Sequence, residues 1–138
     1  MRLSRIALLV VPTFLAASAC GDPEAPTFDE VVGTYEATLF TTRIGVATVD
    51  QLEAGASITL VLAPDGSTTG RLFVPEGNED GSDFDASLAG TWLLNDRTVT
   101  LDHATDTFMR DMSYRADGTR LTGEETFGDV RISVVLSK

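Results

Sequence analysis

The feature that most constrains the fold is an alternation of apolar and polar residues that turn residues break at short intervals. The alternation is clearest over residues 83–94, where every second residue is apolar or small: Phe84, Ala86, Leu88, Gly90, Trp92 and Leu94. A period of two is typical of a strand with one buried face, and no stretch after residue 30 shows a convincing helical period. The chain is therefore expected to be all-β.

Turn signals such as Pro64-Asp65-Gly66 and Ala116-Asp117-Gly118 divide residues 31–138 into short segments. We count about eight strands, joined mostly by hairpin turns. Sequential hairpins place sequence neighbours side by side, and a meander of this size leaves two exposed edges unless it closes. The sequence predicts a single antiparallel up-and-down β-barrel, with a two-sheet β-sandwich as the alternative.

Two strand assignments decide which side chains are expected inside. The first strand is predicted near residues 31–40, with Tyr35, Ala37 and Leu39 on one face. A later strand is predicted from the spacing of Phe108, Met112 and Tyr114, which share a face at a period of two.

The first 20 residues have the organisation of a secretory signal peptide. Arg2 and Arg5 precede a short apolar run, and Ala17-Ser18-Ala19 leads to Cys20. This ending resembles a bacterial lipobox, although Ala17 stands where that pattern usually has Leu. The resemblance implies that the signal is removed, that the Cys20 thiol is acylated and that the chain is exported and lipid-anchored to the bacterial cell envelope.

The alternative is an ordinary signal cleaved at the same small residues, which would leave Cys20 as a free thiol. The chain has one Cys, so no intramolecular disulfide can form, and an unpaired thiol is a liability in an oxidising compartment. Lipidation is therefore preferred, and the membrane (inner or outer) is left open.

The remainder divides into two parts. Residues 21–30 contain two prolines, a glycine and four acids, and are expected to form an extended tether. Residues 31–138 are expected to form the barrel.

The net charge of −11 repels phosphate backbones, so nucleic acid is not expected as a partner. We expect a monomer without a cofactor.

Residues 31–138 resemble the lipocalin-like group of small bacterial lipoproteins. The resemblance rests on Gly33-Thr34-Tyr35, on Gly90-Thr91-Trp92, on the Asp-Gly turns and on the hydrophobic closing strand. Tyr35 stands where classical lipocalins usually have Trp. The resemblance implies a barrel with an apolar interior and carries over no catalytic residue.

Catalysis and metal binding have weak sequence support. His103 is the only histidine, and its turn-like surroundings predict an exposed loop position, so an enzyme is not expected.

Acidic residues and an asparagine are concentrated in residues 76–85. Their oxygen ligands would suit Ca²⁺, but the spacing does not match an EF-hand. We interpret this segment as a solvated loop, and no metal site is assigned.

Two charged residues interrupt apolar faces on strands predicted to be neighbours. Arg110 is in register with Met112, and Glu125 is in register with Gly123. Both are predicted to point inward, where a buried charge requires a partner. They would form an ion pair, or Arg110 would hold the acidic head group of a ligand. In the second case the apolar part of that site would be lined by Trp92, Phe84 and Tyr114.

Two functions are therefore expected. The first is a non-catalytic barrel that binds a small apolar or amphipathic ligand. The alternative is a protein-interaction or inhibitor module with a filled interior, because barrels of about eight strands can be plugged by their own side chains.

Overall fold

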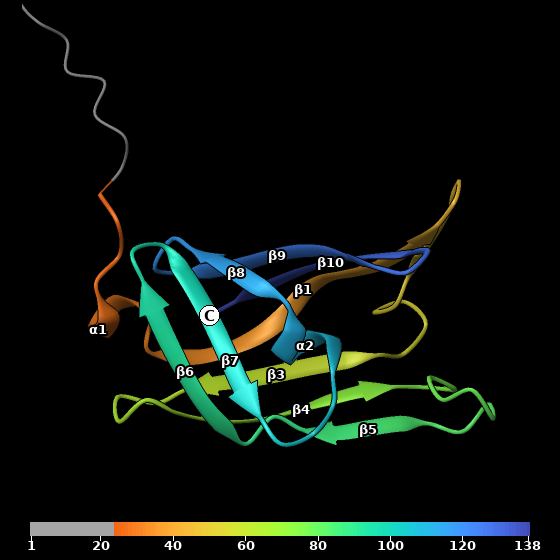
Figure 1. The fold of residues 1–138 in the computed structure, drawn as a ribbon, viewed down its shortest axis with the longest axis horizontal. Coiled ribbons are helices and arrows are strands. Elements are labelled where there is room, and N and C mark those ends of the chain that lie inside the picture. The colour runs from red at the N-terminus through yellow and green to blue at the C-terminus, as the bar shows by residue number, and fades with distance from the viewer. Residues whose placement is uncertain (1–23) are drawn as a thin grey trace, which may run out of the picture.

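The structure, a computed structural model, describes residues 24–138 as ten strands and two short helices (Figure 1). The helices are α1 (Phe28–Val31) and α2 (Phe108–Asp111). The strands are β1 (Gly33–Ile44), β2 (Ala47–Asp50), β3 (Ser57–Leu62), β4 (Ser67–Val74), β5 (Phe84–Ser87), β6 (Gly90–Asn95), β7 (Thr98–His103), β8 (Ser113–Ala116), β9 (Arg120–Phe127) and β10 (Val130–Ser137).

Eight of the strands close into an antiparallel barrel in the order β1-β3-β4-β6-β7-β8-β9-β10. Closure comes from pairing β1 with β10, in a register that runs from Glu36 opposite Ser137 to Ile44 opposite Val130. The predicted closed barrel is therefore confirmed, and the sandwich alternative is not adopted.

The other two strands flank the barrel at one end. The second half of β1 pairs with β2 instead of β3, and the second half of β4 pairs with β5 instead of β6. Figure 1 shows the β1–β2 hairpin projecting beyond the other strands at the end away from α1. The barrel wall is consequently less regular at this end, which we call the open end.

A β-bulge in β1 corrects the predicted facing of its residues. The register against β10 shifts between Ala37 and Leu39, which leaves Thr38 as the extra residue. The Thr38 hydroxyl lies 3.1 Å from the Ser137 hydroxyl. Beyond the bulge Leu39 is 40% exposed and Phe40 is 2% exposed. The prediction that Leu39 shares the inward face with Tyr35 is wrong, because an inserted residue exchanges the two faces.

The end of the barrel opposite the hairpin is covered by α1. Thr27 and Glu30 form a capping box: the Thr27 amide donates to Glu30 Oε2 at 2.7 Å, and the Glu30 amide donates to Thr27 Oγ1 at 3.4 Å. The Phe28 ring stacks on Trp92 with centroids 4.3 Å apart. The predicted extended tether, residues 21–30, is thus wrong from Phe28 onward, since these residues are helical and packed against the barrel.

The two ends of the described chain meet at this covered end. The Lys138 ammonium donates to the carbonyls of Glu30 and Val32, and it lies 5.4 Å from the centre of the Tyr35 ring. The Tyr35 hydroxyl donates to the Val31 carbonyl at 2.6 Å. Burial raises the pKa of Tyr35 to about 12. These contacts fix α1 over the barrel.

A single hydrophobic core runs through the barrel interior. Its largest fully buried side chains come from seven strands, from the connection between β5 and β6, and from the segment around α2: Trp92, Tyr35, Tyr114, Ile58, Leu60, Leu62, Leu72, Leu88, Met109, Met112, Leu121 and Leu136. Met109 belongs to α2 and is fully buried. The prediction of a strand through Phe108 is therefore wrong: Thr107 caps a helical turn, and the strand begins only at Ser113.

Candidate functional site

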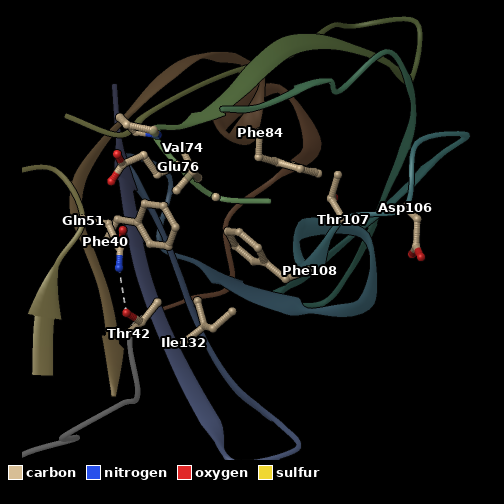
Figure 2. Close-up of a pocket in the computed structure, with 12 residues that line it drawn as sticks. Phe40, Thr42, Gln51, Val74, Glu76, Phe84, Asp106, Thr107, Phe108 and Ile132 are labelled. Carbon is tan, nitrogen blue, oxygen red and sulfur yellow. Dashed lines mark hydrogen bonds between the residues drawn. The ribbon is translucent and has the colours of Figure 1, made fainter. Parts of the chain in front are cut away.

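A pocket of about 420 Å³ opens at the open end of the barrel (Figure 2). Its walls come from β1, β4, β5 and β10 together with the segments after β2, after β4 and around α2. The lining residues are Phe40, Thr42, Gln51, Val74, Pro75, Glu76, Gly77, Phe84, Asp106, Thr107, Phe108 and Ile132. The lining combines an apolar wall with a polar rim.

Three phenylalanine rings form much of the apolar wall. Phe40 comes from β1 beyond the bulge, Phe84 from β5 and Phe108 from α2. The rings of Phe40 and Phe108 lie with centroids 5.4 Å apart and are tilted by 33°. The bulge and the helical turn thus bring two of the three rings into the pocket wall. Neither irregularity was predicted from the sequence.

The polar rim begins with Gln51, which follows β2. Its backbone amide donates to the Phe40 carbonyl at 2.8 Å. Its side-chain amide donates to Thr42 Oγ1 at 2.7 Å, the dashed line in Figure 2. Gln51 is therefore held in place and leaves its side-chain oxygen available as an acceptor.

Glu76 supplies a carboxylate to the same rim from a tight turn after β4. The Gly77 amide donates to the Val74 carbonyl at 3.2 Å, and Glu76 has φ of 52°. With Pro75 in the second position, this is a type II turn, whose third position favours Gly or Asn. A glutamate at this position is strained, and such strain is common where a side chain serves a function.

Arg110 does not point into the barrel. It lies in α2, and its guanidinium pairs with Asp106 at 2.5 Å and with Asp111 at 3.0 Å. These carboxylates raise the pKa of Arg110. The predicted pair with Glu125 is wrong because the helical turn carries Arg110 to the surface beside its own neighbours.

The other predicted site residues are dispersed. Phe84 lines the pocket, as Figure 2 shows. Trp92 is buried under Phe28 at the covered end, where its indole donates to the Ala63 carbonyl at 3.0 Å. Tyr114 is fully buried, its hydroxyl lies 3.3 Å from the Met109 sulfur, and burial raises its pKa. Glu125 is exposed on β9 and does not line the pocket.

His103 corrects another prediction. It is 4% exposed at the end of β7, and its Nε2 lies 2.8 Å from Oγ1 of the pocket residue Thr107. Its Nδ1 has no hydrogen-bond partner within the described residues. Burial, together with the nearby Arg110 charge, lowers the pKa of His103. The loop position expected from its polar neighbours is wrong because the ring turns inward to support Thr107.

The acidic segment 76–85 uses several of its polar groups to hold its own turns. Asp80 accepts from the Ser82 amide at 3.0 Å and from its hydroxyl at 2.6 Å, which lowers the pKa of Asp80. Asp83 accepts from the Glu76 amide at 3.0 Å. Across residues 24–138 no three His, Cys, Asp or Glu side chains are grouped so that they could hold a metal ion.

The projecting β1–β2 hairpin is a second notable surface. Its tip exposes Ile44 by 59% and Val46 by 97%, and Val49 is 48% exposed. Residues 37–49 contain no acid, although the chain has 21. The hairpin is thus an apolar projection from a strongly acidic protein.

Comparison with protein families, with curated proteins and with solved structures found no significant match. In the part of the chain described here, no helix has the length and apolar character needed to cross a membrane. Phe40, Gln51 and Glu76 were missed as site residues. Of these, only Glu76 had a signal in the sequence. Pro75-Glu76-Gly77 indicates a turn, but Gly stands one position after the residue that takes the positive φ.

Proposed function

We propose that this protein is a lipid-anchored cell-envelope lipoprotein whose barrel binds a small apolar or amphipathic ligand at its open end. The observation that best supports this proposal is the pocket of about 420 Å³ with Phe40, Phe84 and Phe108 in its wall. Its volume lies in the range of small-molecule sites, which combine apolar walls with a few polar groups. Buried core side chains occupy the barrel interior beyond this pocket, so we expect the ligand at this end.

The test of the pocket is binding of a neutral naphthylamine dye, whose fluorescence rises in apolar surroundings. Phe84→Asp should weaken dye binding at least about tenfold, because it places a charge in the apolar wall. Phe73→Asp is the matched control. Phe73 lies on the same strand pair, opposite Asp85, and the Arg71 guanidinium covers its ring at 5.0 Å on the outer face. Equal loss in both variants would contradict the assignment.

The anchor is tested separately. Cys20 lies outside the described residues, and its lipidation rests on the lipobox resemblance. In the bacterial host, Cys20→Ser should move the full-length protein from the membrane pellet to the soluble fraction. A Cys20→Ser protein that stays in the pellet would rule out attachment through this residue.

A second candidate function, an interaction module, is favoured by the exposed hairpin. Its apolar tip and its single cation, Arg43, suit an envelope protein that presents an apolar surface with acidic surroundings. A photo-reactive residue at Val46 should cross-link to one such protein in the host envelope, whereas the same residue at Leu93, 71% exposed on the barrel wall, should not. Identical products from both positions would argue against it.

A further inference from the structure

The charges around the pocket bear on which ligands it accepts. No lysine or arginine lines it, whereas Glu76 and Asp106 do. Arg110, two residues after the lining residue Phe108, is paired with both Asp106 and Asp111. An acidic head group would therefore meet carboxylates at the rim and find no uncommitted cation among the lining residues.

Glu76 is the rim carboxylate that remains without a cationic partner. Among the ion pairs of residues 24–138, none includes Glu76. In Figure 2, Glu76 and Gln51 lie beside the Phe40 ring, while Asp106 lies on the other side, beyond Thr107 and Phe108. The uncompensated negative charge of the pocket thus stands next to its aromatic wall.

The combination of aromatic rings with a carboxylate suits a particular kind of cation. Aromatic faces attract ammonium groups through the ring quadrupole, and cages of such rings recognise quaternary ammonium ligands. The rings also provide apolar area for an attached hydrocarbon chain. The net charge of −11 adds a field that raises the local concentration of cations.

We infer that the pocket selects a cationic amphiphile, an ammonium head on a short hydrocarbon chain, over an acidic amphiphile of the same length. The hydrocarbon lies against Phe40, Phe84 and Phe108, and the ammonium lies at the rim beside Glu76. This inference rests on the pocket being a binding site, as proposed above. It reverses the polarity of one of the two alternatives left open by the sequence, in which Arg110 would hold an acidic head group.

The experiment is calorimetric titration at low salt with decyltrimethylammonium, decanol and decanoate. The two charged amphiphiles are kept below their micelle concentrations, and decanol is kept below its solubility limit. These probes share one chain and differ in head group. The ammonium should bind most tightly, at least about tenfold more tightly than decanoate, which corresponds to about 1.4 kcal/mol. Decanol should be intermediate.

Two variants separate the pocket from the general field. Glu76→Gln should weaken decyltrimethylammonium binding several-fold and leave decanol binding unchanged. Glu79→Gln removes the same charge from the same loop, at a residue that does not line the pocket, and should leave both unchanged. Fluorescence of Trp92, which lies at the covered end, verifies that both variants are folded.

The failures are distinguishable. If none of the three probes binds, the proposed ligand-binding function is wrong. If decanoate binds as tightly as the ammonium, the pocket is a binding site but its preference for cations is wrong. If Glu76→Gln and Glu79→Gln weaken ammonium binding equally, the overall charge attracts the cation and the assignment to Glu76 is overturned.

Discussion

Removing the Phe28 side chain should open the covered end of the barrel. Phe28 is 38% exposed, so about three-fifths of its surface is out of water, and its ring stacks on Trp92 at 4.3 Å with planes 10° apart. Burying a whole phenylalanine contributes about 2–3 kcal/mol, and an aromatic pair adds about 1 kcal/mol. Phe28→Ala should therefore lower the free energy of unfolding by about 2 kcal/mol.

The chain supplies its own probe for this change. Trp92 is the only tryptophan and is 2% exposed, so its emission reports directly on the contact with Phe28. In Phe28→Ala one face of the indole meets water, and the emission should shift to longer wavelength before any denaturant is added. Equilibrium unfolding in urea, followed by the same fluorescence, gives the free energy.

Val46→Ala is the control for general loss of apolar area, because Val46 is 97% exposed. It should change the free energy of unfolding by less than about 0.5 kcal/mol. If Phe28→Ala behaves like Val46→Ala in stability and keeps the parent emission, α1 does not seal the barrel in solution and the reasoning is refuted.

Three further predictions concern single residues. A Cβ at Gly90 would lie 2.0 Å from the Asp102 carbonyl oxygen, so Gly90→Ala should cost at least about 2 kcal/mol in urea unfolding. Because burial lowers the pKa of His103 from its ordinary 6.5, the unfolded chain binds a proton at a higher pH than the folded protein does. Stability should thus fall as the pH drops through about 6.5, and His103→Gln, compared at pH 7.5 and 5.5, should reduce this fall. Glu76→Gly should raise the free energy of unfolding by about 1 kcal/mol, seen as a higher Tm, since it relieves a positive φ of 52°; an unchanged Tm would remove the argument for strain.

The barrel could be predicted because its determinants are local and repeated. The alternation around Trp92 and the Asp-Gly turns each specify a strand or a hairpin without reference to distant residues. Closure then follows from the need to pair both edges. One local signal was available but unused: Thr27 and Glu30 have the spacing of a capping box, which indicates the start of a helix.

The pocket could not be predicted because it depends on two irregularities without a distinctive sequence. The bulge at Thr38 occurs at an ordinary strand residue, yet it directs Phe40 inward and Leu39 outward. The turn of α2 is only four residues long, too short for a helical period to be read. It moves Arg110 away from the interior and leads His103 to be buried against Thr107.

The pairing of β1 with β10 also governs the order in which this chain can fold. Glu36 and Ser137 are partners about a hundred positions apart, and contacts of such separation slow folding because a long loop must close first. The hairpins between β6 and β10 can form early, since each joins neighbouring segments. Until Val130–Ser137 is in place, β1 and β9 both present unpaired edges, which are templates for association with other chains. The last strand is therefore the step at which a chain either closes on itself or aggregates.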